Sequence, residues 1–354
     1  MTIDELTRTT GEWLRGVGPL ADVVISSRIR LARNLSRYPF LSTAGVSDKT
    51  AIYRAIVDEI PSVSATDDDG FLVDVEQAEE LDRQVLVERH LISKQHAAGE
   101  GSRGVSIASD ETSSLMINEE DHLRIQGLRS GLQLDTIWDE VNEVDDTLAQ
   151  RLDFAYDKRL GFLTACPTNV GTGIRVSVML HLPALKLTRE IEKVSRAAHD
   201  LRLAVRGLHG EGTEALGDLY QLSNQTTLGK SENEIIAAFG TIVIPRIVEY
   251  EREARATLAR EKPYELDDRI WRAFGILNNA RTIGSEETLA LLSPIRMGIH
   301  VGRFNRTDIN TVNELFLLTQ PAHLQKISGR LLDGAARAVA RAERIRDLLA
   351  TDRS

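Results

Sequence analysis

The first two thirds of the chain alternate short strand-like runs with helical patterns. Residues 23–31 alternate polar and apolar side chains, which is typical of a half-buried strand. Two pairs of short runs flank turn residues and predict hairpins, namely 105–108 with 114–118 and 154–156 with 162–165. Helical crossovers of about 10 to 15 residues, typical of parallel sheets, do not recur regularly. The pattern therefore predicts an α+β fold on a mostly antiparallel sheet flanked by helices.

Helical periodicity marks several segments of this part and all of the rest. In the first part it covers residues 48–60, 77–91, 146–152 and 187–200. Residues 174–180 are also expected to be helical, because they follow a glycine-rich loop. From Ser231 onward the pattern predicts helices only.

The helical part begins with a capping box. Ser231 and Glu234 begin a helix that should run to about residue 260, with a kink at Pro245. Start signals follow at Ser285, Thr307 and Pro321, and a final amphipathic helix covers residues 331–349. The sequence therefore predicts an N-terminal segment (1–22), an α+β domain (23–254) and an all-α C-terminal domain (255–354).

Composition excludes several classes of protein. The 354 residues have a net charge of -10 and 42% hydrophobic content, as in ordinary soluble proteins and unlike disordered or fibrous ones. The single cysteine forbids an intramolecular disulfide and favours a reducing compartment. Residues 1–16 lack the apolar core of a signal peptide, and the longest apolar run, 235–244, is too short to span a bilayer. We expect a cytoplasmic protein with no membrane or nucleic-acid partner.

The basic residues are strongly biased, with 35 arginines and eight lysines. The planar guanidinium suits bidentate contact with phosphate or carboxylate, so the bias can reflect an anion site. A GC-rich genome gives the same bias. The positions of individual arginines must decide between the two explanations.

A first motif lies in residues 26–34, Ser-Ser-Arg-Ile-Arg-Leu-Ala-Arg-Asn. Arg28 and Arg30 are two apart on a predicted strand, so their side chains lie on one face. Two adjacent cations repel each other unless an anion lies between them, which favours a phosphate site. The alternative is a solvated strand face paired with carboxylates.

A second motif follows an apolar run in residues 116–124, Met-Ile-Asn-Glu-Glu-Asp-His-Leu-Arg. The adjacent carboxylates of Glu119 and Glu120 can accept a proton, order the waters of a metal ion or bind a cationic substrate. Arg124 ends the motif and adds another cation. An acidic surface turn is the alternative.

A third motif, Cys-Pro-Thr-Asn-Val-Gly-Thr-Gly, occupies residues 166–173. If a helix follows at 174–180, its N-terminus would lower the pKa of the Cys166 thiol and favour a thiolate. Arg175 would then lie in the first helical turn, where it opposes the helix dipole unless an anion is bound. A buried cysteine beside a tight turn is the alternative.

A fourth motif, residues 206–214, reads Arg-Gly-Leu-His-Gly-Glu-Gly-Thr-Glu. Three glycines in seven residues predict a mobile loop that acts as a lid over a site, with Glu211 as its best-placed carboxylate. An inert surface turn is the alternative. No Gly-Lys-Ser/Thr follows the glycines, so this is not a Walker A loop, and protein-kinase motifs are absent.

The four motifs in this order resemble those of the phosphagen (guanidino) kinase family. The resemblance spans residues 23–250 and implies the family's glutamine-synthetase-like catalytic domain at 23–254. Family members that act on small guanidines have a helical domain before this one, whereas here the first motif begins at residue 26 and a helical domain follows. This layout is similar to that of the bacterial protein-arginine kinases (McsB type).

The resemblance implies transfer of the ATP γ-phosphoryl group to arginine side chains of proteins, which marks them for degradation. Mg²⁺ would bind through ATP phosphates and water. Glu120 would be the base, Glu211 would contact the guanidinium from a second side, Cys166 would lie beside it as a thiolate, and Glu119 would orient the metal's waters. The nucleotide would contact Ser26, Ser27, Arg28, Ile29, Arg30, His90, Arg124, Arg175, Val176, Ser177, Val178, Met179, Arg206, Gly207, Leu208, His209, Gly210 and Glu211. His90 can alternatively be a purely structural histidine.

Two other functions remain open. One is a kinase of free arginine or another small guanidino compound, which the absence of the enclosing domain disfavours. The other is a non-catalytic adaptor of a protease system, which the intact motifs disfavour.

The resemblance also implies partners and an allosteric site. It implies protein substrates with accessible arginines, a zinc-binding activator protein, a chaperone-protease and a homodimer formed through the C-terminal helical domain. Protein-arginine kinases commonly have Arg-Asp-x-x-Arg-Ala as a phosphoarginine pocket near the C-terminus. Here Asp333-Gly334-Ala335-Ala336-Arg337-Ala338 stands in its place, so only Arg337 and Ala338 match. The sequence disfavours the same activation, and Arg337 can be a solvated helix residue.

Overall fold

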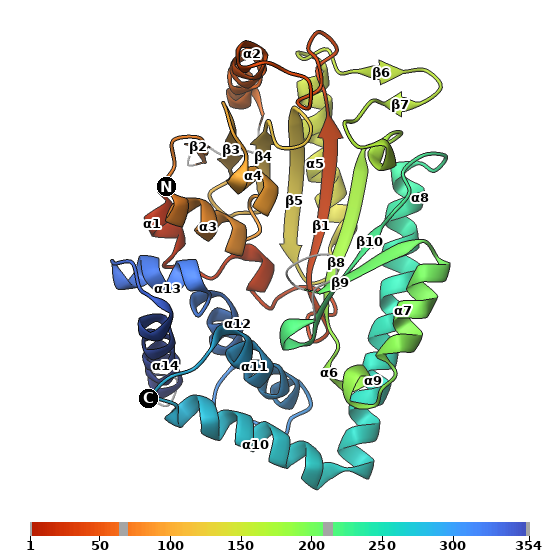
Figure 1. The fold of residues 1–354 in the computed structure, drawn as a ribbon. Helices are drawn as coiled ribbons and strands as arrows, with labels where there is room; N and C mark the ends of the chain where they lie inside the picture. The colour runs from red at the N-terminus through yellow and green to blue at the C-terminus, as the bar shows by residue number, and fades with distance from the viewer. Residues whose placement is uncertain (1, 64–69, 208–214, 352–354) are drawn as a thin grey trace.

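An antiparallel sheet forms the centre of the molecule. The computed structural model describes residues 2–63, 70–207 and 215–351. Eight strands follow the order β2-β3-β4-β5-β1-β8-β10-β9, and each neighbouring pair is antiparallel (Figure 1). They are β1 (Val24–Arg33), β2 (Phe71–Asp74), β3 (Gly104–Ile107), β4 (Ser113–Ile117), β5 (Leu123–Ser130), β8 (Ile174–His181), β9 (Leu203–Gly207) and β10 (Leu219–Asn224). The predicted antiparallel sheet is confirmed.

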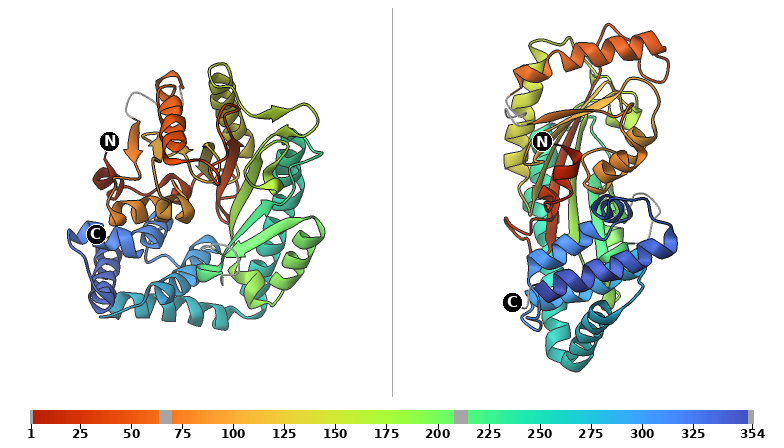
Figure 2. Two further views of the ribbon diagram at one scale, coloured as in Figure 1. Left: turned by 45° about the horizontal axis from the view of Figure 1, so that its top comes forward. Right: turned by 90° about the vertical axis from the view of Figure 1, so that its left-hand side faces the viewer.

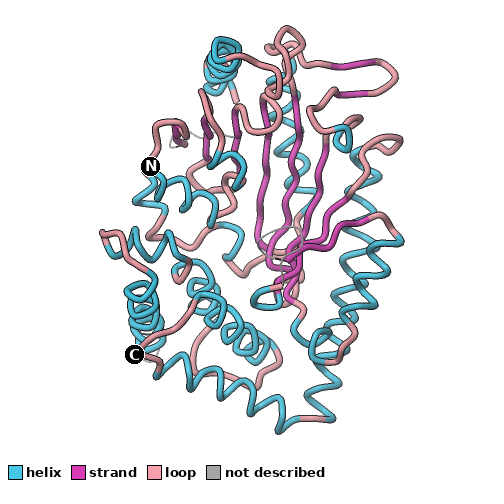
Figure 3. The backbone as a smooth tube through the Cα atoms, in the orientation of Figure 1, coloured by secondary structure: helices cyan, strands magenta, loops and turns pink. Residues whose placement is uncertain are grey.

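Helices accompany the sheet and form the rest of the chain. In the first part they are α1 (Ile3–Leu6), α2 (Val46–Val57), α3 (Glu80–Glu88), α4 (Lys94–Ala98), α5 (Leu134–Ala149), α6 (Pro183–Leu187), α7 (Ile191–Asp200) and α8 (Glu232–Ala237). The later ones are α9 (Ile244–Glu261), α10 (Pro263–Asn279), α11 (Ser285–His300), α12 (Ile309–Leu318), α13 (Pro321–Ser328) and α14 (Gly334–Thr351). Helices α10 to α14 gather at one end of the sheet with the C-terminus (Figures 2 and 3).

The two faces of the sheet differ in chemistry. Helix α5 packs on β1 and β5, and α7 packs on β9. Alternate residues of the central strands, such as Ile29, Val176 and Val178, are fully buried in the main hydrophobic cluster. Most of the residues between them, such as Arg28, Arg30 and Ser177, are polar or charged and lie on the opposite face. The sheet therefore presents one polar face for a site.

Both predicted hairpins are present. β3 pairs with β4, and Tyr156–Asp157 (β6) pairs with Gly161–Phe162 (β7). The predicted helix over 174–180 is wrong, because these residues form β8 between β1 and β10. Ile174, Val176 and Val178 are β-branched and repeat with a period of two, which favours a strand. This pattern outweighs the glycine-loop signal.

The helical predictions hold elsewhere with shifted boundaries. The segment predicted over 146–152 is only the end of α5, which begins at Leu134. The capping box at Ser231 is present. A π-helical turn, η5 (Ala238–Val243), precedes Pro245, and α9 begins at Ile244. Because proline has no backbone N–H to donate, the change in hydrogen-bond register falls just before it.

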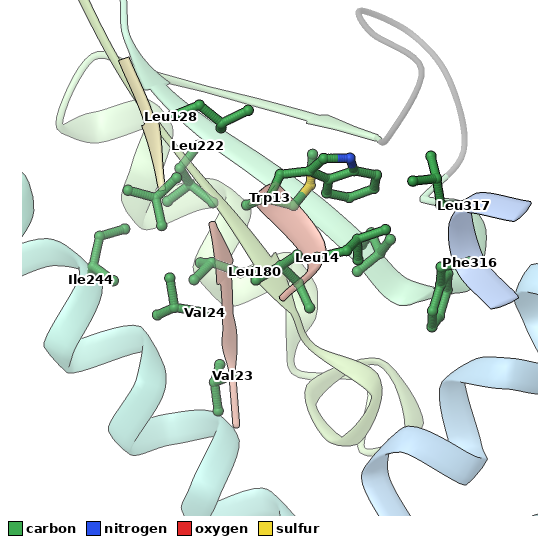
Figure 4. Packing of buried hydrophobic residues seen from close by; sticks show 14 of the residues in the cluster. Trp13, Leu14, Val23, Val24, Leu128, Leu180, Leu222, Ile244, Phe316 and Leu317 are labelled. Atoms are coloured by element: carbon green, nitrogen blue, oxygen red, sulfur yellow. The ribbon is translucent and has the colours of Figure 1, made fainter. Parts of the chain in front are cut away.

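One large hydrophobic cluster joins the sheet to the C-terminal helices. A short 3₁₀ turn, η1 (Glu12–Leu14), places Trp13 and Leu14 between these two parts. In Figure 4, Leu180 lies on the sheet side of this turn, and Phe316 and Leu317 of α12 lie on the other side. The core is therefore continuous between the α+β part and the helical part.

Candidate active site

Five arginines lie on the polar face of the sheet, and we call them the arginine cluster. The cluster consists of Arg28 and Arg30 on β1, Arg124 on β5, Arg175 on β8 and Arg206 on β9. Residues directly opposite each other in an antiparallel pair share a face, and faces alternate along each strand. Arg30 lies opposite Arg175, Arg124 opposite Ala32, and Arg206 opposite Gln221, which itself lies opposite Met179. The register therefore brings all five to one face.

The charges in the arginine cluster oppose one another. Burial, followed by the charges of Arg175 and Arg124, lowers the pKa of Arg28 to about 10. Burial and the charges of Arg28, Arg124 and Arg175 lower the pKa of Arg30 well below its usual value, although Glu119 acts in the opposite direction. The buried Nε of Arg30 has no hydrogen-bond partner among the described residues. Unneutralised positive charge with a free donor favours an anionic ligand.

A small pocket lies beside the arginine cluster. Five residues predicted to contact the nucleotide line it, together with Leu128 and Gln221; the five are Ser26, Arg28, His90, Ser177 and Met179. Arg28 Nε donates to Ser177 Oγ at 3.3 Å. The structure thus brings together nucleotide-contact candidates from β1, from β8 and from His90, which lies two residues after the end of α3. Leu128 and Gln221 were missed by the sequence analysis, and only the strand register reveals them.

Four other nucleotide-contact candidates have side chains on the opposite face of the sheet. The side chains of Ile29, Val176 and Val178 lie in the hydrophobic core, so only their backbone atoms are available to a nucleotide on the polar face, and their predicted contacts stay predictions. Ser27 is also buried on that side, where its hydroxyl donates to the Gly131 carbonyl at 2.7 Å. Gly207 ends β9. Four further candidates lie outside the described residues, namely Leu208, His209, Gly210 and Glu211.

Two glutamates follow β4 at the edge of the arginine cluster. Arg124 contacts Glu119 at 2.6 Å and Glu120 at 3.0 Å. The Glu119 side chain is 1% exposed, and it accepts hydrogen bonds from Ser93 Oγ and the Glu120 backbone N–H. The Glu120 side chain is 33% exposed. The two adjacent carboxylates therefore have different surroundings, and Glu120 is the more accessible one.

The Glu119 carboxylate is stabilised in its charged form. Burial alone would raise its pKa, but the charge of Arg124, the hydrogen bond from Ser93 and the charge of Arg30 outweigh burial and lower it. A carboxylate that already accepts these bonds is suited to orienting neighbours. Glu120, with one contact to Arg124, has an oxygen left for another partner.

Cys166 lies on a loop rather than at the start of a long helix. It precedes a single 3₁₀ turn, η3 (Pro167–Asn169), and β8 follows that turn. The predicted helix dipole beside Cys166 and Arg175 is therefore absent, and that explanation for a reactive thiol is wrong. The Cys166 Sγ lies 2.9 Å from Thr168 Oγ1 and is partly exposed.

Asp121 ties the glutamate turn to the Cys166 loop. Its side chain is fully buried, and Oδ1 accepts hydrogen bonds from Asn34 Nδ2 and from the Ala165 backbone N–H, both at 2.7 Å. Asn34 Oδ1 in turn accepts from the His122 backbone N–H at 2.9 Å. Both Asn34 and Asp121 lie within sequence motifs, but no role was predicted for either. The position of Asp121, directly after Glu119 and Glu120, is the signal that could have identified it.

The C-terminal allosteric candidate makes hydrogen bonds with residues close to it in the sequence. Arg337 lies in the first turn of α14, and its Nη1 donates to the Leu332 carbonyl at 2.8 Å. Asp333 accepts a hydrogen bond from the Ala336 backbone N–H at 2.8 Å. The prediction that phosphoarginine does not activate this chain in the same way stays a prediction.

Comparisons with known proteins show the family of this chain. Residues 51–254 match the family model described as "ATP:guanido phosphotransferase, C-terminal catalytic domain". This chain belongs to the ATP:guanido phosphotransferase family. Residues 263–354 match a second model, described as "Protein-arginine kinase McsB C-terminal domain".

Curated relatives match this chain over nearly its full length. The protein-arginine kinase of Halothermothrix orenii is 46% identical over 98% of both chains. That of Bacillus subtilis is 42% identical over 95% of this chain and 93% of the relative. These matches confirm the resemblance to the protein-arginine kinase branch.

The fold is shared with solved structures of two other kinases. A taurocyamine kinase of Schistosoma mansoni has a TM-score of 0.60 at 24% identity, over 67% of this chain and 34% of that one. A lombricine kinase has a TM-score of 0.58 at 24% identity, over 68% and 69% of the two chains.

Proposed function

We propose that this chain is a protein-arginine kinase that binds the ATP phosphates with the arginine cluster and transfers the γ-phosphoryl group to arginine side chains of proteins. The observation that carries the proposal is the meeting of five arginines and two differently exposed glutamates on one face of the sheet. Guanidinium forks suit phosphate oxygens, and preorganised positive charge stabilises a transferring phosphoryl group.

The acceptor requires a base. A guanidinium with a pKa above about 12 is not a nucleophile, so it must lose a proton as it attacks the γ-phosphorus. We assign this proton to the Glu120 carboxylate, because Glu120 is the more exposed of the two glutamates. Glu211, outside the described residues, is proposed to bind the guanidinium from a second side. Cys166 is proposed to lie beside the guanidinium as a thiolate.

The residues present fit a magnesium ion bound through the nucleotide. Mg²⁺ prefers oxygen ligands and keeps several waters, and when bound it would neutralise charge on the phosphate oxygens. Glu119 and Glu120 supply carboxylate oxygens at the edge of the arginine cluster. Glu119, whose carboxylate stays charged, is proposed to orient waters of the ion rather than to bind it directly.

The proposed partners follow the relatives' protein-arginine kinase identity. We propose protein substrates with accessible arginines, degradation of the products by a chaperone-protease, a zinc-binding activator, and a cytoplasmic location. Within the described part of the chain, no helix is long and apolar enough to cross a membrane. Residues 1–22, 23–254 and 255–354 are proposed as the structural divisions.

A homodimer through the C-terminal helices has support on α10. Tyr264 is 87% exposed, and Trp271 and Ile276 are 41% and 44% exposed on the same helix. Large apolar side chains left in solvent are typical of surfaces that bind another protein.

Incubation with γ-labelled ATP tests the function. The chain is offered free arginine in one reaction and an arginine-rich unfolded protein in another, and the products are then treated with mild acid. Acid-labile label on the protein alone is expected. Label on free arginine would instead support a small-guanidine kinase, and no label on either would support a non-catalytic adaptor.

A further inference from the structure

Three consecutive residues at the end of α3 connect the C-terminal helices to the pocket beside the arginine cluster. Glu88 is the last residue of α3, Arg89 follows it, and His90 lines the pocket with Arg28. Together they form a short path of buried polar contacts between α13 and the pocket.

Glu88 binds the first turn of α13. Its carboxylate accepts hydrogen bonds from the backbone N–H groups of Ala322 at 2.8 Å and of His323 at 3.0 Å. A carboxylate at this position is favoured by the helix dipole and by the free N–H groups of the first turn. Glu88 Oε2 also lies 2.7 Å from His323 Nδ1.

The contacts of His323 assign its tautomer. Because Nδ1 faces the Glu88 carboxylate, it carries the proton and donates. Nε2 is then an acceptor, and it lies 3.3 Å from Arg89 Nη1, which can only donate. The side chain of His323 is fully buried. A residue of the C-terminal helical part therefore completes the coordination of an arginine in the α+β part.

Arg89 is a fully buried cation whose position depends on its partners. Its guanidinium makes a salt bridge with Glu111 and donates to the Thr9 carbonyl at 3.1 Å. His323 fills a remaining acceptor position. Removal of one partner from a buried charge is costly, and the guanidinium would shift to find another acceptor.

His90 is placed by the same stretch of backbone. It has a positive φ of 61°, which is unusual for a residue other than glycine. Gln126 Nε2 donates to its carbonyl at 2.8 Å, and the Trp13 ring packs edge-on at 4.5 Å. A backbone in this conformation persists only where its surroundings enforce it. A shift of Arg89 would therefore move the adjacent ring that lines the pocket.

We infer that His323 is a positioning residue for nucleotide binding, acting from α13 through Arg89 on His90. This inference rests on the proposed function, because it takes the pocket beside the arginine cluster as the nucleotide site. It makes the C-terminal helices part of the nucleotide site although they contribute no residue to the pocket lining.

Two isosteric variants of the full-length chain separate the two contacts of His323. His323→Gln places a side-chain carbonyl near the position of Nε2 and can still accept from Arg89. His323→Asn keeps a donor near the position of Nδ1 for Glu88 but has no acceptor for Arg89. Lys326→Ala is the matched control, because Lys326 lies on the same helix and pairs with Asp4 and Asp82 instead.

The measurement is the dissociation constant of ADP and of ATP, with circular dichroism to establish folding. We expect His323→Asn to weaken both by about five-fold or more, His323→Gln to restore most of the affinity, and Lys326→Ala to stay within about two-fold of the unaltered chain. In a His90→Ala background, His323→Asn should have little further effect. If His323→Asn folds poorly, His323→Leu replaces it in both backgrounds, because leucine fills buried space but offers Arg89 no acceptor, and the same two outcomes decide the question.

Two results would overturn the inference. One is nucleotide affinity in folded His323→Asn equal to that of Lys326→Ala, and the other is an undiminished effect of His323→Asn when His90 is alanine. Arg28→Ala separates this failure from failure of the proposed function. If Arg28→Ala abolishes binding while His323→Asn does not, the nucleotide site stands and only the role of His323 fails. If Arg28→Ala binds normally, the proposed site itself fails.

Discussion

Arg30 lies where most neighbouring charges are positive. Burial and three other guanidinium groups disfavour its charge, and among the described residues Glu119 favours it. Such an arrangement costs stability in the absence of an anion, because buried like charges repel each other. If ATP binds there as proposed, its phosphates would remove this repulsion and would therefore bind strongly. We therefore expect the arginine cluster to lower the stability of the free chain and to increase its affinity for ATP.

Replacing Arg30 with methionine tests both effects, on the stability of the free chain and on its affinity for ATP. Arg30→Met keeps much of the side-chain volume and removes one charge, so we expect the free chain to unfold at an equal or higher temperature. ATP affinity should fall about ten-fold or more, because a charge-assisted contact is lost. Thermal unfolding with and without ATP measures both effects.

The control for this variant is Arg272→Met, whose parent side chain is 74% exposed and pairs only with Asp268 in the described part of the chain. It should leave both quantities unchanged. A lower melting temperature for free Arg30→Met together with an undiminished ATP-induced increase would contradict the role given to Arg30.

The turn between β4 and β5 acts as a connector at the scale of whole elements. Asp121 is buried beside Glu119 and Glu120 and accepts from the backbone N–H of Ala165, next to Cys166. The proposed base and the proposed thiolate therefore belong to segments that one carboxylate holds together. A substitution of Asp121 should therefore change the reactivity of the Cys166 thiol through the backbone of the loop.

The single cysteine gives a direct reading of this connection. We expect Asp121→Ala to change the rate at which iodoacetamide alkylates Cys166 by several-fold, because the loop loses its anchor to the glutamate turn. Asp121→Asn keeps an oxygen that can accept from Ala165 and should lie closer to the unaltered chain. Mass spectrometry at fixed times measures the rate.

Folding of each variant is checked separately by thermal unfolding. An alkylation rate in folded Asp121→Ala equal to that of the unaltered chain would show that Asp121 does not position the Cys166 loop.

The elements themselves were partly predictable. Val23–Leu31, both hairpins and the helical C-terminal part follow from local periodicity, which the structure retains in β1, β3, β4 and α9 to α14. β8 was missed because its period-two apolar pattern competes with a glycine loop that is also typical of helix starts. The predicted helix dipole at Cys166 failed with it.

The site shows the same division between local and nonlocal information. The prediction that Arg28 and Arg30 share a face follows from the alternation of side chains along a strand alone. Arg30 lies opposite Arg175, and predicting this pair requires the register of two strands nearly 150 residues apart in sequence. No local pattern contains that register. The burial of Val176 and Val178 in the core was hidden for the same reason. His323 had no signal, because its contacts cross from one part of the molecule to the other.

Buried histidines make the stability of the whole molecule sensitive to pH. Burial, as the largest cause, lowers the pKa of His96 and His300 to about 4 and that of His181 well below its usual value. In the unfolded chain these groups titrate near 6.5. Folded-state pKa values below the unfolded value mean that the unfolded chain binds more protons. Stability is therefore complete above about pH 6.5 and is lost as the pH falls toward 4.

Urea unfolding at pH 7.5 and pH 5.5 tests this dependence. The free energy of unfolding should be lower at pH 5.5, and in His96→Gln the difference should shrink by about 1 kcal/mol. Glutamine is a suitable replacement because its amide N–H can still donate to the Gly104 carbonyl, as His96 Nε2 does at 3.1 Å. An equal loss in His96→Gln and the unaltered chain would exclude His96 as a source.

The most direct test of the proposed chemistry is a single-turnover assay with ATP and a peptide that contains one arginine. Its twin has lysine at that position, and Glu120→Gln is compared with the unaltered chain. We expect phosphoarginine on the arginine peptide only. Glu120→Gln should bind ATP within a few-fold and slow the transfer by about 10² to 10⁴, because the proton acceptor is lost. Transfer by Glu120→Gln at the unaltered rate, or equal loss of ATP binding and transfer, would contradict the mechanism.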